Sequence, residues 1–288
     1  MKKLHTYLNS LGVTLGILSL TPAALSHEGE SHKMASDMKM NHCSHEDQQE
    51  PTIKVDVLLS SQAQKDKIIP TRIKLTSIKD HKEVLLTDLK EVHTEKIHIL
   101  IFDQTLTDYQ HVHPTPTKEP GVYEFRWTPK NEGTYKIWVD IVPLNTGKEE
   151  YISTNLATVG NYSPAAEKKL SLDEKIGNNL YSLAFETKEL KKGQAAMGKI
   201  KVLNNEGKDV KDLEPIMGAF AHIVAINEDF KTIAHVHPMG KEPTDEKERG
   251  GPELMFHFMP EKSGFYKIWL QIKLAGEEIF VPFGVNVN

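Results

Sequence analysis

A duplicated histidine pattern constrains this chain of 288 residues more than any other feature. The pattern H-x12-H-V-H-P occurs twice, and the second copy begins 124 residues after the first. Most residues between the histidines differ between the copies, so the imidazoles are what the duplication retains, and a metal site is the first hypothesis. The histidines are His98, His111 and His113 in the first copy and His222, His235 and His237 in the second.

The spacing within one copy fits a pair of strands. His111 and His113 are two residues apart, so in an extended chain both side chains point to one face. The thirteen-residue step from His98 to His111 suits two antiparallel strands joined by a turn near Asp103, with His98 opposite or diagonal to the other two histidines. Cross-strand neighbours have Cβ atoms about 4.5–8 Å apart, which lets three imidazoles converge on one ion. The alternative is that these are partly buried structural histidines that make hydrogen bonds.

Other side chains are candidate donors beside the two triads. His93 is the candidate in the first site, and Met217 or His257 in the second. His257 aligns with Arg126 in the repeat, so its participation gives the two sites different charge and ligand number. Whether the triads bind one ion each or face each other across a shared site is left open by the sequence.

Short runs of alternating hydrophobic residues, rich in β-branched side chains, follow Pro51 and are separated by Gly, Pro, Asn and Asp. This pattern is typical of β-strands. We expect an all-β protein with two tandem immunoglobulin-like antiparallel β-sandwich domains. The predicted domains are residues 51–160 and 169–288, joined by a polar linker at 161–168.

A second repeated block, P-x3-G-x-Y-K-I-W, follows each histidine pattern. Its tyrosines, Tyr135 and Tyr266, resemble the tyrosine corner of immunoglobulin-like sandwiches. We expect Trp138 and Trp269 to be core or sheet-face residues. The block is interpreted as structural, with no chemistry assigned to it.

The N-terminal residues 1–26 have the organisation of a secretory signal peptide. Lys2 and Lys3 precede an apolar segment, and small residues follow at the expected cleavage point. We therefore expect a periplasmic or secreted protein. No later segment has the length needed to span a bilayer, so no membrane span is expected in the mature chain. The single cysteine excludes an intramolecular disulfide.

Residues 27–50 contain no branched aliphatic or aromatic side chain, so this segment is predicted to be disordered. Sulfur donors suit Cu(I) or Ag(I), while imidazole also suits Cu(II), Zn(II) and Ni(II). We interpret the segment as metal-capturing; the alternative is a solvated low-complexity tail with incidental histidines. Its donors are His27, His32, Met34, Met38, Met40, His42, Cys43 and His45.

The second copy also carries a family resemblance. Its Met217-Gly-Ala-Phe-Ala-His222 lead, Glu228-Asp-Phe segment and His235-Val-His237-Pro sequence, followed by P-x3-G-x-Y, resemble exported bacterial immunoglobulin-like domains of the YtkA-like and copper-resistance-associated groups. The resemblance covers roughly residues 85–142 and 209–274. It implies an immunoglobulin-like fold and a role in heavy-metal homeostasis. The first copy lacks the Met-Gly-Ala lead, so the two copies are not equivalent.

These observations predict a metal-binding protein that serves copper binding, transfer or resistance. Copper is the expected ion, with silver, nickel or zinc as alternatives, and a metal efflux or delivery protein is the candidate partner. A net charge of −5 without a basic patch argues against nucleic acid. We expect binding rather than catalysis. The alternatives are a metal-dependent enzyme, since three histidines leave a coordination position open, and an adhesive or protein-interaction sandwich with structural histidines.

Overall fold

The computed structural model describes residues 50–59, 62–92, 94–160, 165–236 and 238–288. The predicted signal peptide and nearly all of the predicted metal-capturing segment lie outside these residues. In the described part, regular structure is almost entirely β-strand, with a short 3-10 helix, η2, at Leu86–Asp88. No described helix has the length and apolar character that a membrane crossing requires.

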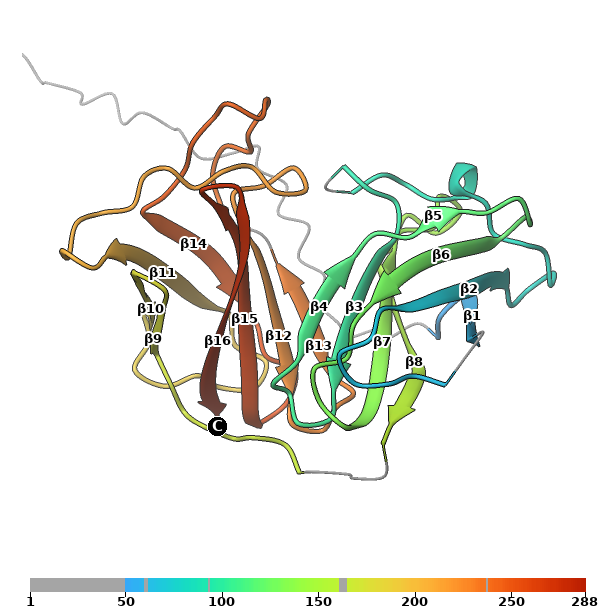
Figure 1. Ribbon diagram of the computed structural model, residues 1–288, viewed down its shortest axis with the longest axis horizontal. Helices are drawn as coiled ribbons and strands as arrows, with labels where there is room; N and C mark the ends of the chain where they lie inside the picture. The colour runs from blue at the N-terminus through green and yellow to red at the C-terminus, as the bar shows by residue number, and fades with distance from the viewer. Residues whose placement is uncertain (1–49, 60–61, 93, 161–164, 237) are drawn as a thin grey trace, which may run out of the picture. The chain divides into compact units, whose positions relative to one another are not determined.

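The first sandwich consists of two four-stranded antiparallel sheets (Figure 1). Its strands are β1 (Ile53–Leu59), β2 (Ile69–Ser77), β3 (His98–Asp103), β4 (Tyr109–Val112), β5 (Thr115–Pro116), β6 (Val122–Trp127), β7 (Gly133–Ile141) and β8 (Glu150–Val159). One sheet has the order β1-β2-β6-β5 and the other β4-β3-β7-β8. This arrangement corresponds to strands A, B, E, D and C′, C, F, G of an immunoglobulin-like sandwich.

The second sandwich also has two four-stranded antiparallel sheets, and one of them ends in a different edge strand, β9 (Figure 1). Its strands are β9 (Asp173–Ile176), β10 (Asn179–Phe185), β11 (Ala196–Asn204), β12 (His222–Asn227), β13 (Ile233–Val236), β14 (Glu253–Phe258), β15 (Gly264–Leu274) and β16 (Glu277–Val287). The sheets have the orders β14-β11-β10-β9 and β13-β12-β15-β16. The predicted fold class of two tandem antiparallel sandwiches is confirmed.

Strand β3 is buried along its whole length, which a strand with one solvent-facing side cannot be. Ile99 and Ile101 point into the core of the first sandwich. Leu100 and Phe102, on the opposite face, belong to a separate apolar cluster that also contains residues of the second sandwich. Strand β12 is buried throughout in the same way. The outer faces of the two histidine-bearing sheets therefore cover each other.

This separate apolar cluster, here called the interface cluster, contains large aromatic side chains from both sandwiches. Phe102 packs edge-on against Trp138 with ring centroids 5.7 Å apart, and Tyr109 lies 5.7 Å from Trp269. Both tryptophans are thus sheet-face residues, as predicted. Its buried members are Leu100, Phe102, Leu106, Tyr109, Trp138, Val224, Ile226, Ile233 and Trp269.

The turns that lead out of β3 and β12 share an unusual backbone conformation. Leu106 has φ of 62° and Phe230, its equivalent 124 residues later, has φ of 56°. A positive φ is uncommon for residues with bulky side chains and persists where packing holds it. Leu106 is a buried member of the interface cluster, and Phe230 packs against that cluster. The interface thus rests on a duplicated turn as well as on the strands.

The tyrosines of the P-x3-G-x-Y block anchor their own sandwiches. The Tyr135 hydroxyl accepts a hydrogen bond from the Asn131 amide at 2.9 Å and donates one to Asp108 Oδ2 at 2.7 Å. The Tyr266 hydroxyl accepts from the Lys262 amide at 3.1 Å. Each bond runs to backbone four residues upstream, which is the geometry of a tyrosine corner. The structural interpretation of the tyrosines is confirmed.

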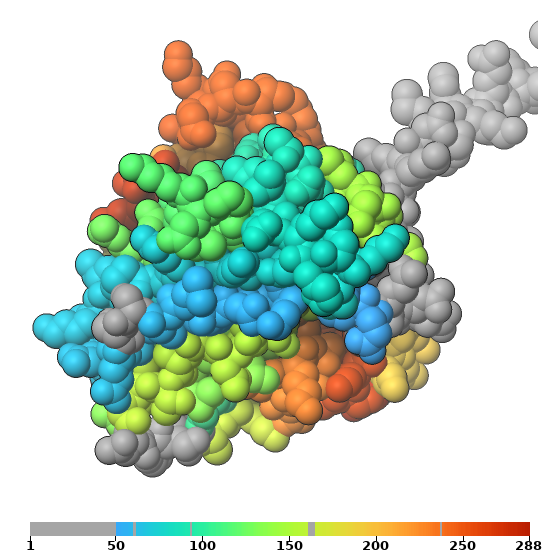
Figure 2. Space-filling view, turned by 90° about the vertical axis from the view of Figure 1, so that its right-hand side faces the viewer, coloured from blue at the N-terminus to red at the C-terminus, as the bar shows by residue number. Residues whose placement is uncertain are grey.

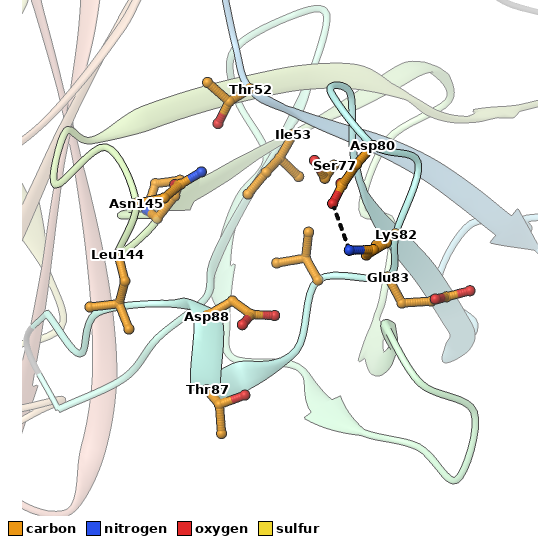
Figure 3. Close-up of a pocket in the computed structure, with 12 residues that line it drawn as sticks. Thr52, Ile53, Ser77, Asp80, Lys82, Glu83, Thr87, Asp88, Leu144 and Asn145 are labelled. Atoms are coloured by element: carbon orange, nitrogen blue, oxygen red, sulfur yellow. Dashed lines mark ion pairs between the residues drawn. The ribbon is translucent and has the colours of Figure 1, made fainter.

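The segment between β2 and β3 covers one side of the first sandwich. Figure 2 shows its teal residues gathered over the blue strands β1 and β2. A hollow of about 400 Å³ separates part of this segment from the sandwich and contains the ion pair between Asp80 and Lys82 (Figure 3). No histidine lines this hollow, so it contributes nothing to the duplicated pattern.

We expect the interface cluster to contribute to the free energy of unfolding. Replacing Phe102 by Ala leaves a cavity between the sandwiches and should lower the free energy of unfolding by about 3–5 kcal/mol. Urea denaturation followed by circular dichroism measures this change. Leu144→Ala is the control, because Leu144 is 58% exposed and its loss should change stability by less than about 0.5 kcal/mol. Equal effects of the two substitutions would contradict the assigned packing.

Candidate metal centre

The histidines occupy equivalent places in the two sandwiches. His98 opens β3 and His111 lies in β4, where it is paired in register with Leu100. His98 is therefore diagonal to His111 on the outer face of the sheet, as predicted. In the second sandwich His222 opens β12, and His235 of β13 pairs with Val224. The same alternation thus brings both sets of imidazoles to the faces that meet at the interface.

Three imidazole nitrogens converge in the first sandwich. His98 Nδ1 lies 3.2 Å from His111 Nε2 and 3.1 Å from His113 Nε2. The second sandwich repeats part of this arrangement, with His222 Nδ1 at 3.4 Å from His235 Nε2. Two nitrogens bound to one tetrahedral ion at 2.0–2.1 Å are about 3.3 Å apart. The measured separations match that value.

Hydrogen bonds on the far side of each ring fix the tautomers in the first sandwich. His98 Nε2 lies 3.0 Å from the Val92 carbonyl, which accepts and cannot donate, so this nitrogen carries the hydrogen. His111 Nδ1 lies 3.0 Å from Gln271 Oε1. The Gln271 amide is oriented by the bond that its Nε2 donates to Glu278 Oε2 at 3.1 Å. His98 Nδ1 and His111 Nε2 consequently face each other as two lone pairs.

In the second sandwich the outer ring nitrogens are also bound to acceptors. His222 Nε2 donates to the Ile216 carbonyl at 3.1 Å. His235 Nδ1 donates to Asp140 Oδ2 at 2.9 Å. The lone pairs of His222 Nδ1 and His235 Nε2 consequently point toward each other. Metal-bound histidines show this arrangement, with one nitrogen on the ion and the other held by a carbonyl or carboxylate.

Burial favours the neutral form of an imidazole. His98 is 2% exposed and His222 is fully buried. Burial lowers the pKa of His98, and burial together with the neighbouring imidazoles holds the pKa of His111 well below its usual value. Burial lowers the pKa of His113 to about 3 and, partly offset by Glu149, that of His235 to about 4. Neutral imidazoles are the protonation state that a metal ion requires.

Two carboxyl groups lie behind His235. Burial raises the pKa of Asp140, while the pKa of Glu149 is raised by burial and then by the charge of Asp140. Glu149 also makes a side-chain hydrogen bond with Asp140. A buried pair of carboxyl groups in contact retains one proton between them. Asp140 then carries the negative charge that accepts the hydrogen from His235.

The two histidine sets meet in one cluster. His111 of the first sandwich has its ring centroid 5.2 Å from that of His222 and 5.4 Å from that of His235. His98 lies 5.7 Å from His235 by the same measure. Two groups of ligand atoms, each lying within 4.8 Å of one another, share His111: His98 with His111 and His113, and His111 with His222 and His235. These groups could hold metal, and the described histidines of the two sandwiches face each other across the interface.

The other predicted donors have different outcomes. His257 lies in β14 opposite Met197, and the two groups within the described residues do not include it. Met217 is half-buried beside Ile216 and has φ of 49°. His93, His237 and the eight donors of residues 27–49 lie outside the described residues. Their predicted roles remain predictions.

Sequence reasoning missed Asp140 and Gln271. They occupy equivalent positions, 131 residues apart, two residues after Trp138 and Trp269. Alternation places them on the same sheet face as the tryptophans, and a polar residue on that face was the available signal. The repeated block was interpreted as structural alone. Its strands β7 and β15 also supply the acceptors that orient two histidines.

A surface hollow reaches the cluster at His113. The side chain of His113 is 16% exposed, against 3% for that of His235. A cavity of about 690 Å³ is lined by His113, Thr115, Arg72, Arg126 and parts of β1. On the same side of the cluster, His113 Nδ1 lies 3.8 Å from Glu95 Oε1. His113 is therefore the member of the first set that solvent contacts.

Comparisons with solved structures give distant similarities. Among solved structures, similarity extends over 82% of this chain to native alpha-2-macroglobulin of E. coli, at 12% identity and a TM-score of 0.28, and this chain spans 14% of that one. The D00-D0 domain of Intimin is similar over 82% of this chain and 100% of its own, at 10% identity and a TM-score of 0.25. Scores this low carry no argument about function.

The sequence comparisons give a family without an activity. A comparison with curated proteins gives no match. The YtkA-like and copper-resistance resemblance therefore rests on the sequence motifs alone. The model of the family described as Domain of unknown function (DUF8832) matches residues 52–158 and 175–288, one segment in each sandwich, and the chain belongs to that family.

Proposed function

We propose that this protein is an exported metal-binding protein that holds transition-metal ions at the buried histidines. The observation that carries the proposal is the pair of facing lone pairs in each sandwich, 3.2 Å and 3.4 Å apart. A cation placed between them would be bound by both nitrogens, at the separation that a tetrahedral ion requires. In both sandwiches the opposite ring nitrogens are already bound to acceptors, so the rings are oriented for an ion.

Copper is the proposed metal. A site made of imidazoles accepts Cu(II), Zn(II) and Ni(II), and among these divalent ions copper binds most tightly to a given set of nitrogen ligands. The donors of residues 27–50 add thioether and thiolate sulfur, which suit Cu(I) and Ag(I). In this proposal the exported chain captures ions with the N-terminal segment, holds them in the histidine cluster and passes them to an efflux or delivery protein in the periplasm or outside the cell.

Binding is favoured over catalysis by the position of the acid beside the cluster. Asp140 contacts Nδ1 of His235, while the lone pair of that ring lies on Nε2, at the other end. The carboxylate therefore positions a ligand and is turned away from an incoming reactant. A general base must reach the proton that it removes. The geometry thus supports an ion carrier better than a hydrolase.

The hydrogen bonds predict fixed tautomers in the metal-free protein. His98 and His222 should carry hydrogen on Nε2, and His111 and His235 on Nδ1. Long-range 1H–15N correlation of the imidazoles measures this directly. Because burial lowers the pKa of His98, His111 and His235, these three rings should become protonated at a lower pH than a free histidine. Protonation of these rings near pH 6.5 would contradict the arrangement.

The metal site is tested with residues 50–288, which carry all the described cores and lack the soft donors of the N-terminal segment. This fragment should retain Cu(II), Zn(II) or Ni(II) at micromolar concentration in equilibrium dialysis with metal analysis. His111→Ala should weaken binding by more than the roughly 10–100-fold that loss of a ligand's hydrogen-bond partner costs.

His257→Ala is the matched control, because His257 is outside both groups of ligand atoms. Its affinity should equal that of the unsubstituted fragment. Failure of the fragment to retain any of the three ions would refute the proposed function. Preference for Zn(II) or Ni(II) over Cu(II) would keep the metal site and remove copper as its ion.

A further inference from the structure

We propose that the two histidine sets form one two-ion centre shared by the sandwiches, in which each sandwich orients a ligand of the other sandwich's ion. This inference rests on the proposed function, since it requires that the histidines bind metal. It goes beyond that function in the number of ions and in the dependence of each ion on both sandwiches.

The number of donors points to two ions. Each ring offers one nitrogen, because the other nitrogen of His98, His111, His222 and His235 carries a hydrogen bonded to an acceptor. Five described imidazoles exceed the four ligands that a tetrahedral ion takes. The described imidazoles also form two groups of three ligand atoms, and each group could hold an ion.

The two ions would be close neighbours. His111 belongs to both groups of ligand atoms, and all atoms of each group lie within 4.8 Å. The ring of His111 lies 5.1 Å from His113 and 5.2 Å from His222, measured between centroids. This ring therefore stands between the two sets. Paired ions in proteins are commonly about 3.5–4 Å apart.

The acceptors cross from one sandwich to the other. Gln271, in β15 of the second sandwich, holds Nδ1 of His111 in the first. Asp140, in β7 of the first sandwich, holds Nδ1 of His235 in the second. The two acceptors are equivalent positions of the repeat, so the exchange is reciprocal. A single sandwich contains its own histidines but lacks one of the groups that orient them.

The exchange of acceptors also predicts different affinities for the two ions. The acceptor behind His235 is a carboxylate, and the acceptor behind His111 is a neutral amide. A carboxylate raises the basicity of the imidazole that it accepts from and adds a negative charge near the ion. The ion of the second set should consequently bind more tightly than the ion of the first set.

The stoichiometry is measured on the full chain with Co(II), by equilibrium dialysis with metal analysis. The paired substitution H98A/H113A removes the first set and leaves His111 in place, whereas H222A/H235A removes the second. Each pair should lower the bound Co(II) by one ion per chain, and all four substitutions together should lower it by two. Binding to the N-terminal segment is common to every variant and cancels in the differences.

The three outcomes are distinct. A loss of two ions in the combined variant supports the two-ion centre. If H98A/H113A, H222A/H235A and the combined variant all lose one ion, the histidines bind a single ion. That result overturns this inference and leaves the proposed function standing. No loss in the combined variant refutes both. Circular dichroism of each variant verifies that the β-sandwiches remain folded.

The crossed acceptors are tested on the ion that remains in each background. In H222A/H235A, Gln271→Leu should lower the Co(II) affinity of the first set by about 10–100-fold, although Gln271 belongs to the other sandwich. In H98A/H113A, Asp140→Leu should do the same to the second set. Gln194→Leu is the matched control, because Gln194 is exposed.

Gln271→Glu keeps an acceptor and should hold the affinity of the first ion at or above its original value, which separates an orienting role from a purely structural one. An unchanged affinity in Gln271→Leu would overturn the crossed arrangement. Equal losses in Gln271→Leu and Gln271→Glu would overturn it too, because the acceptor would then have no specific part in binding.

Discussion

The burial of β3 and β12 on both faces is the constraint on which the histidine cluster depends. Each strand packs one face into its own sandwich and presents the other to the interface. His98 and His222 lie at the starts of these strands, on the interface side, so the same packing excludes water from their rings. Burial lowers the pKa of His98, and it strengthens every hydrogen bond to a fixed acceptor. The interface cluster thus positions the histidines without contacting their inner nitrogens.

The sequence predicted the sandwiches and the diagonal placement of His98 and His111, because both follow from local periodicity and from the spacing within one copy. It could not predict that His98 and His111 meet His222 and His235. Leu100 and Phe102 alternate with Ile99 and Ile101, and an uninterrupted apolar strand does not reveal which partner covers each face. For the same reason Asp140 and Gln271 were missed, since their importance arises from a contact between residues about a hundred positions apart or more.

The duplicated positions show what is common to the two halves and what has diverged. Val92 and Ile216 use backbone carbonyls to hold His98 and His222, so their side chains are free to differ. Asp140 and Gln271 both accept from a histidine and both contact a glutamate, Glu149 or Glu278. What differs is charge, because a carboxylate stands in one half and an amide in the other. The hydrogen-bond pattern is therefore shared, while the electrostatics of the two halves are not.

The hydrogen bonds of the cluster fix the orientation of its rings. Buried polar groups are tolerated when they are paired, and here the outer nitrogens of four rings are bound to fixed acceptors. The apolar contacts around Phe102, Trp138 and Trp269 hold the sandwiches together independently of the histidines. An ion that entered between the inner nitrogens would need little rearrangement, because ring orientation and tautomer are already set. Its binding energy would then go to coordination instead of to ordering the site.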